Sequence, residues 1–303
     1  MSQLKSQQKP QPAYIPTYAL LGLLLGLATC ILRPQPAQAF QLRDHKQITT
    51  EAIQEFTNCF PEAKSALTQK WILVGDLGED VNLITKELLY SHYFNPHKKL
   101  VMWRYDSSVR ISRLESALAP GTGALKVSNT FSSMLELGQV IHHLQDASVP
   151  PHVVPVSHGL GDGFESFVSN SDISSGMSCT ELTMLARKSP AQVLIETAEV
   201  TLLTVATDKV EVEAITFGRA QTMSLGLNAF WQEAPGDAFG EYGVLGNHYG
   251  EPQFKSPGGV LFNVPSDFYE HLKQKQMRLA VRATLQALLW YVNPIQSGAL
   301  AQP

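Results

Sequence analysis

Apolar residues recur every three to four positions along most of the chain, which is the spacing of one buried face of an α-helix. This periodicity predicts helices over residues 47–56, 61–73, 83–90, 109–118, 128–147, 190–205, 210–231 and 266–292. The alternation of apolar and polar residues that is typical of strands does not compete seriously with it. The expected fold class is therefore all-α, with a single compact multi-helix domain.

Two stretches rich in glycine and proline interrupt the helical pattern. The sequence Pro-Gly-Thr-Gly at 120–123 predicts a turn. The longer stretch, 235–259, predicts a surface loop, for which a lid over a site is the alternative interpretation.

The stretch from Leu137 to His152 combines helical periodicity with metal-ligand chemistry. His142 and Asp146 are four residues apart, so a helix would place both side chains on one face. Two prolines at 150–151 are expected to end this helix, and His152 follows them directly. A histidine and a carboxylate one turn apart, with a second histidine close by, predict the beginning of a zinc site.

The first 39 residues have the features of a signal peptide. A basic segment precedes an apolar core at 18–32, which is short for a membrane span, and an Ala-Gln-Ala cleavage sequence ends at Ala39. Cleavage there would make Phe40 the N-terminus of a domain of residues 40–303, which would be secreted or periplasmic. An uncleaved N-terminal membrane anchor is the alternative.

Composition narrows the function classes only slightly. Of the 303 residues, 44% are hydrophobic, which suits one large or two small domains. The formal net charge of -4 gives no reason to expect strong binding to a nucleic-acid backbone through charge alone. After cleavage, Cys59 and Cys179 would remain, and they could form a disulfide bond in an oxidising compartment or stay as two separate buried thiols.

Histidines are concentrated around the central stretch. The chain has nine histidines, and four of them fall between residues 141 and 158. Further residues that could bind a metal lie on either side: His45, Asp80 and His92 before the stretch, and His158, Asp162 and Glu165 after it. Imidazole and carboxylate groups without cysteine argue against a purely structural zinc site and suit a hydrolytic one.

In this order the residues resemble the motifs of the zinc-dependent phospholipase C and single-strand nuclease family. The family's sequence HxxxDxxxxxH is matched by His142, Asp146 and His152. Its Ser-His-aromatic-aromatic-x-Pro element is matched by residues 91–96. The resemblance implies an all-α domain of this type that holds three zinc ions in a cleft and hydrolyses a phosphodiester.

The resemblance also assigns the ligands. The first zinc ion would take Asp80, His92, His142 and Asp146; the second His152, His158 and Glu165; the third His45, Asp146 and the backbone of Phe40, where the family usually has Trp. Asp162 is the alternative to Glu165 because it keeps the family's spacing from His158, although the glycines around it disfavour a helix. On spacing alone His143 could replace His142. Asp80 is the candidate general base, or the residue that orients the attacking water.

The expected activity is phospholipase C-like cleavage of phospholipid headgroups, because the elements at 91–96 and 164–168 look more like those of the phospholipases. A single-strand nuclease with 3′-nucleotidase activity and a non-catalytic zinc-binding relative are the alternatives. The expected partners are a phospholipid or another phosphodiester substrate and, peripherally, a membrane surface. The protein is expected to be a monomer, with no stable nucleic-acid partner unless it is a nuclease.

Overall fold

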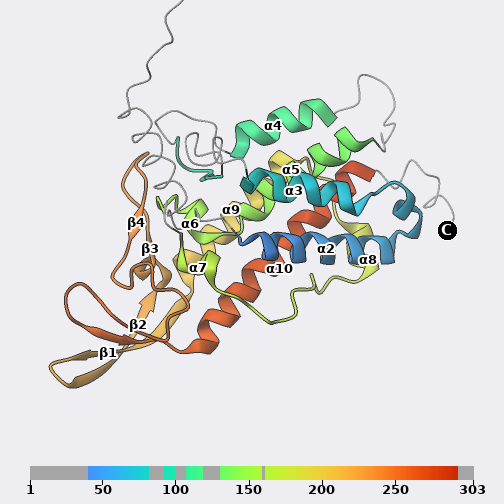
Figure 1. Ribbon diagram of the computed structural model, residues 1–303. Coiled ribbons are helices and arrows are strands. Elements are labelled where there is room, and N and C mark those ends of the chain that lie inside the picture. Colours follow the sequence, from blue (N-terminus) through green and yellow to red (C-terminus); the bar gives the residue numbers. More distant parts are fainter. Residues whose placement is uncertain (1–39, 82–91, 100–106, 119–129, 159–160, 293–303) are drawn as a thin grey trace, which may run out of the picture. The chain divides into compact units, whose positions relative to one another are not determined.

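A computed structural model of the protein describes residues 40–81, 92–99, 107–118, 130–158 and 161–292. Helix α5 (Phe131–Asp146) is the central helix. Around α5 pack α2 (Leu42–Cys59), α3 (Gln69–Val81), α4 (Ser107–Leu118), α9 (Pro190–Thr207) and α10 (Ser266–Val292) (Figure 1). The shorter helical segments are η1 (Pro61–Ser65), α6 (Pro150–Val153), α7 (Gly163–Ser166), α8 (Cys179–Met184) and η3 (Leu227–Ala229). None of the helices in the described part of the chain is long and apolar enough to cross a bilayer.

The helices predicted at 128–147, 190–205 and 266–292 are confirmed as α5, α9 and α10. Serine or threonine side chains cap the first two: Thr130 accepts a hydrogen bond from the third residue of α5, and Ser189 does the same for α9. The predicted signal peptide, the helix predicted at 83–90 and the turn predicted at 120–123 lie outside the described residues.

The prediction of an all-α fold is wrong. Helices hold 56% of the described residues, but strands hold 13%. A four-stranded antiparallel sheet has the order β2-β1-β6-β5, and a separate two-stranded sheet pairs β3 with β4. The strands are β1 (Lys209–Thr216), β2 (Arg219–Gly226), β3 (Trp231–Gln232), β4 (Glu241–Tyr242), β5 (Gln253–Lys255) and β6 (Leu261–Asn263).

A hairpin of β1 and β2 takes the place of most of the helix predicted at 210–231. The buried side chains of β1 alternate along the strand: Val210, Val212 and Ala214. The two residues of the turn, Phe217 and Gly218, have φ angles of 49° and 74°. Positive φ at both positions gives the turn twist that favours two-residue hairpins. The loop predicted at 235–259 likewise contains β4 and β5.

Helices α3 and α5 approach each other so closely that two glycines are required. A Cβ atom added at Gly75 would lie 2.0 Å from the carbonyl oxygen of Leu135, and one at Gly138 would lie 2.1 Å from that of Ile72. Any side chain at either position would therefore push the helices apart. This contact holds the carboxylates of α3 against the histidines of α5.

Replacing Gly138 with alanine is expected to lower the free energy of unfolding by about 1–3 kcal/mol, the usual cost of overpacking. Gly78, also on α3, is the matched control, because an added Cβ there meets nothing within 4 Å. Gly78→Ala is expected to stabilise the protein by about 0.5–1 kcal/mol, since alanine is the better helix former. Denaturant unfolding of both variants would test this, and equal effects would contradict the close approach.

The two cysteines of the predicted mature chain form a disulfide bond. Cys59 at the end of α2 and Cys179 at the start of α8 have an S–S distance of 2.08 Å. Of the two alternatives left open by the sequence, the structure therefore has the paired one. The bond joins residues 120 positions apart and so reduces the conformational entropy of the unfolded chain.

Candidate metal centre

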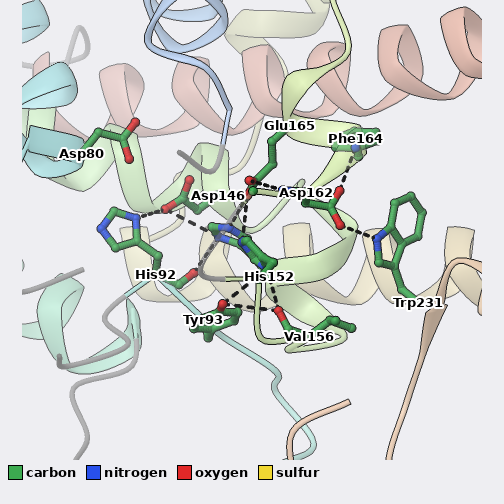
Figure 2. Close-up of polar contacts among 12 residues, drawn as sticks. Asp80, His92, Tyr93, Asp146, His152, Val156, Asp162, Phe164, Glu165 and Trp231 are labelled. Carbon is green, nitrogen blue, oxygen red and sulfur yellow. Dashed lines mark hydrogen bonds and ion pairs between the residues drawn. The ribbon is translucent and has the colours of Figure 1, made fainter. Parts of the chain in front are cut away.

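Buried histidines and carboxylates from several separate segments meet beside the C-terminal half of α5 (Figure 2). Four groups of three have donor atoms within 4.8 Å of one another: His45, Asp76 and His142; Asp80, His92 and His142; His92, His143 and Asp146; and His152, His158 and Glu165. All of these side chains are buried. Every ligand assigned by the resemblance, Asp80 included, lies in one of these groups except Phe40.

The first cluster is arranged around Asp146. Its Oδ2 atom lies 2.6 Å from His92 Nδ1 and 3.4 Å from His142 Nε2. Its Oδ1 atom lies 3.6 Å from His45 Nε2. Asp80 faces two of the same nitrogens, at 3.7 Å from His45 Nε2 and 3.8 Å from His142 Nε2. Three imidazole nitrogens and two carboxylates therefore converge on one small region.

The Nδ1 atoms of His45 and His142 point away from this region and contact polar residues behind the two rings. Asp76 Oδ1 lies 3.4 Å from His142 Nδ1 and 3.6 Å from His45 Nδ1. Gln145 Oε1 lies 2.5 Å from His45 Nδ1, and Thr49 donates a hydrogen bond of 2.5 Å to Asp76 Oδ2. Contacts of this kind place the single proton of a neutral ring on Nδ1, so that Nε2 is the nitrogen that can bind a metal ion. On the sequence, Asp76 is an extra candidate one helical turn before Asp80, expected either in solvent or behind the metal ligands; the structure buries it behind His45 and His142.

Replacing Asp76 with asparagine is expected to weaken zinc binding by about 10–100-fold, the usual effect of losing a residue that orients metal ligands. A neutral amide would attract the Nδ1 sides of the two rings, 3.4 and 3.6 Å away, more weakly than a carboxylate does. Competition with a chelator would measure the change without any activity assay. Glu79→Gln is the matched control, since Glu79 is a buried carboxylate of the same helix that pairs with Arg110 and His143. Equal weakening in both variants would contradict this role of Asp76.

The second cluster consists of two histidines that share one carboxylate. Glu165 Oε1 lies 2.9 Å from His152 Nε2 and 3.0 Å from His158 Nε2. The Nδ1 atoms of both rings contact backbone carbonyls, of His92 at 3.0 Å and of Val156 at 2.5 Å. Because a carbonyl oxygen can only accept, both Nδ1 atoms carry the proton and both Nε2 atoms are available as ligands.

The segment that carries this cluster differs in detail from the prediction. The prolines at 150–151 follow the end of α5 but also open a new short helix, α6, and His152 lies inside it. Proline is favoured at a first helical position because its fixed φ suits the helix and its missing N–H is not needed there. Glu165 lies on the four-residue helix α7.

Asp162 is occupied by contacts that do not involve the histidines of the second cluster. It caps α7 by accepting a hydrogen bond of 2.7 Å from the backbone N–H of Phe164. Its other oxygen accepts hydrogen bonds of 3.1 Å from the Trp231 indole and 2.9 Å from the Tyr242 hydroxyl (Figure 2 shows the first). Of the two alternatives for the second cluster, Glu165 is the one that the structure brings to the histidines. Trp231 and Tyr242 come from β3 and β4, which the sequence did not predict.

The electrostatics of both clusters favour a bound cation. Burial opposes charge on His142, but the carboxylates of Asp146, Asp80 and Asp76 outweigh it and raise the pKa of His142 to about 10. Despite burial, Glu165 raises the pKa of His158 to about 9. These histidines thus attract protons strongly when no other cation is present.

Two unpaired buried atoms test the fit of a metal ion directly. His45 Nε2 and Asp146 Oδ1 face each other at 3.6 Å, and neither has a hydrogen-bond partner within the described part of the chain. Buried polar atoms without partners are rare, and such atoms call for an explanation. A nitrogen and a carboxylate oxygen facing each other in this way suit a zinc ion held by N and O ligands.

Phe40 and His143 lie next to the first cluster. The Phe40 side chain is fully buried, and its ring centroid lies 5.6 Å from that of His45. This places the predicted mature N-terminus beside a predicted ligand, while ligation by the Phe40 backbone stays a prediction. His143 belongs to one of the donor groups with His92 and Asp146, and its Nε2 lies 3.7 Å from Glu79.

No family model matches the chain, and neither a curated protein nor a solved structure matches it.

Proposed function

We propose that the chain is an exported zinc-dependent phosphodiesterase that cleaves phospholipid headgroups in the manner of a phospholipase C. The observation that carries the proposal is that one imidazole, His152, joins the two clusters. Its Nδ1 lies 3.9 Å from Asp146 Oδ2, and its Nε2 lies 2.9 Å from Glu165 Oε1. Metal positions built on these residues would be neighbours, which suits a reaction that stabilises both the attacking and the leaving oxygen.

The three proposed zinc positions use the ligand sets that the resemblance implies. They are Asp80, His92, His142 and Asp146; His152, His158 and Glu165; and His45, Asp146 and the Phe40 backbone. Bound zinc would lower the pKa of a water molecule to about 7 and offset the charge that develops on the phosphodiester. Asp80 is proposed to orient this water or to accept its proton.

The chain itself supplies orientation and a dry environment. Asp76, Gln145 and two backbone carbonyls contact the Nδ1 sides of His45, His142, His152 and His158, so the positions of these Nε2 atoms are fixed before any metal binds. Asp80 and Asp146 are 1% and 0% exposed, so water has little access to weaken their attraction for a cation.

Export after cleavage at Ala39 is part of the proposal. The Cys59–Cys179 bond supports it, because disulfides persist mainly in oxidising compartments outside the cytosol. Cleavage would also convert the Phe40 nitrogen from an amide into an amine, which is a far better zinc ligand.

The test is the metal content of the secreted chain, with its N-terminus determined on the same sample. About three zinc ions on a chain that begins at Phe40 are expected, and removal by a chelator should abolish hydrolysis of phosphatidylcholine until zinc is restored. The product should be diacylglycerol and a phosphorylated headgroup.

Other outcomes would change the conclusion in distinct ways. Turnover of single-stranded DNA or RNA instead of lipid would identify a nuclease. Bound zinc without turnover of either substrate would identify a non-catalytic zinc protein. The absence of tightly bound metal on the processed chain would overturn the proposal.

A further inference from the structure

The turn of the β1–β2 hairpin exposes an aromatic side chain at a backbone position that disfavours one. Phe217 is 102% exposed and has a φ of 49°. Bulky residues rarely adopt positive φ, and glycine, asparagine or aspartate normally fill such turns. No aromatic or cation–π contact of Phe217 occurs among the described residues. The fold therefore gains no packing from this ring, which suggests that its partner lies outside the molecule.

The residues that surround Phe217 combine apolar and cationic groups. Strand pairing places Ile215 opposite Leu261, and Leu261 opposite Lys255. We call residues 215–220 and 255–261 together the hairpin tip. Its two charged residues, Arg219 and Lys255, are both cationic and exposed.

Acidic groups begin only further down the sheet. The carboxylate nearest to the tip along the strands is that of Glu213, which is paired with Asn263 across β1 and β6. The Asn263 amide donates a hydrogen bond of 2.6 Å to it. The tip is thus locally cationic on a chain whose net charge is -4. In Figure 1 the β1–β2 hairpin extends away from the helices that carry the metal centre.

We infer that the hairpin tip is a docking surface for phospholipid bilayers, with the Phe217 ring inserted among the lipids and Arg219 and Lys255 against their phosphates. Aromatic rings favour the interfacial zone of a bilayer, and cationic side chains near the surface are attracted to anionic lipids. A turn at the end of an extended hairpin can enter this zone without any change in the helices. The inference deepens the proposed function, since a surface that binds bilayers would bring the metal centre to its lipid substrate.

The experiment measures vesicle binding, which does not require turnover and therefore does not depend on the outcome of the activity assays. Co-sedimentation of the processed chain is compared for Phe217→Asn and the wild type, on phosphatidylcholine vesicles with and without phosphatidylserine. Asparagine tolerates positive φ, so the variant should fold at least as well as the wild type. Binding should fall about tenfold or more, the order expected for one aromatic side chain leaving an apolar environment.

Two further variants make the result specific. Met184→Asn removes another strongly exposed apolar side chain, 78% exposed on α8, and should leave binding unchanged. Arg219→Gln combined with Lys255→Gln should remove the preference for phosphatidylserine while keeping part of the binding to phosphatidylcholine.

The inference is overturned if the wild type does not bind vesicles, if Phe217→Asn binds as well as the wild type, or if Met184→Asn weakens binding as much as Phe217→Asn does. It is also overturned if the wild type sediments as a dimer that Phe217→Asn converts to a monomer and neither binds vesicles. In that case the occupant of the tip would be a second copy of the chain.

Discussion

Replacing Asp146 with asparagine is expected to reduce kcat on the order of 10³-fold, more than the 10–100-fold typical of residues that only orient ligands. Asp146 is fully buried and lies within 4 Å of imidazole nitrogens from His45, His92, His142 and His152. No other carboxylate of the described residues contacts as many of the predicted ligands. Asparagine keeps the size of the side chain but removes the charge and one anionic oxygen.

The metal content should fall with the activity, because Asp146 belongs to two of the three proposed ligand sets. Measuring zinc per chain in Asp146→Asn, Glu165→Gln and Asp162→Asn separates the positions. Glu165→Gln should lose the ion of the second cluster alone, while Asp162→Asn should keep its full zinc content. Full zinc content in Asp146→Asn, or loss of zinc only in Asp162→Asn, would contradict the assignment.

The metal centre was predictable from the sequence only in part. The four-residue spacing of His142 and Asp146 shows that they share a helix face, because helix geometry is local. That His45, Asp80 and His92 join them depends on how α2, α3 and the segment at 92–99 pack, and only the family resemblance indicated this. Which rings Asp76 contacts was not predictable, since a helix position alone does not reveal which neighbouring side chains a carboxylate will meet.

A local sequence signal, the capping box at 162–165, distinguishes Asp162 from Glu165. Asp-x-x-Glu at 162–165 has the form of a capping box, and in the structure both side chains accept hydrogen bonds from the backbone at the start of α7. A capping aspartate is committed to the backbone. This leaves Glu165, whose second oxygen reaches the histidines, as the residue able to serve the second cluster.

The sheet was missed because most of its determinants are not local. The alternation of Val210, Val212 and Ala214 was present in β1, but the longer apolar pattern that follows resembles a helix. Strand β1 is completed by pairing with β6, about fifty residues further along the chain. Very short strands such as β3 and β4 give no periodic signal at all. By contrast, apolar residues recur at helical spacing along the whole of α10, and its predicted bounds agree with the structure.

Removing zinc is expected to lower the Tm of the processed chain on the order of 10 °C at neutral pH. A ligand at a thousand times its dissociation constant stabilises the folded state by about 4 kcal/mol, and each kcal/mol shifts the Tm of a domain of this size by about 2–4 °C. Thermal unfolding of the zinc-loaded and the chelator-treated protein would measure the difference.

This difference should grow as the pH rises from 6 to 9. In the metal-free protein the pKa of His142 is about 10 and that of His158 about 9, both above the value of about 6.5 expected in the unfolded chain. Bound protons therefore stabilise the metal-free fold below about pH 6.5, and this contribution is lost as the pH rises through the folded-state values, at up to about 1.4 kcal/mol per pH unit for each proton.

In the zinc-loaded protein the same histidines are neutral ligands that hold no proton on Nε2, so the loss between pH 6.5 and 10 should be absent. The Tm difference between the two forms should accordingly be smallest near pH 6, where protons also compete with zinc for the imidazoles. Phe217→Asn is a suitable control, because the hairpin tip contains none of these ligands and its pH profile should match the wild type. A Tm difference that does not change with pH, or that shrinks as the pH rises, would show that the metal does not replace protons on these histidines.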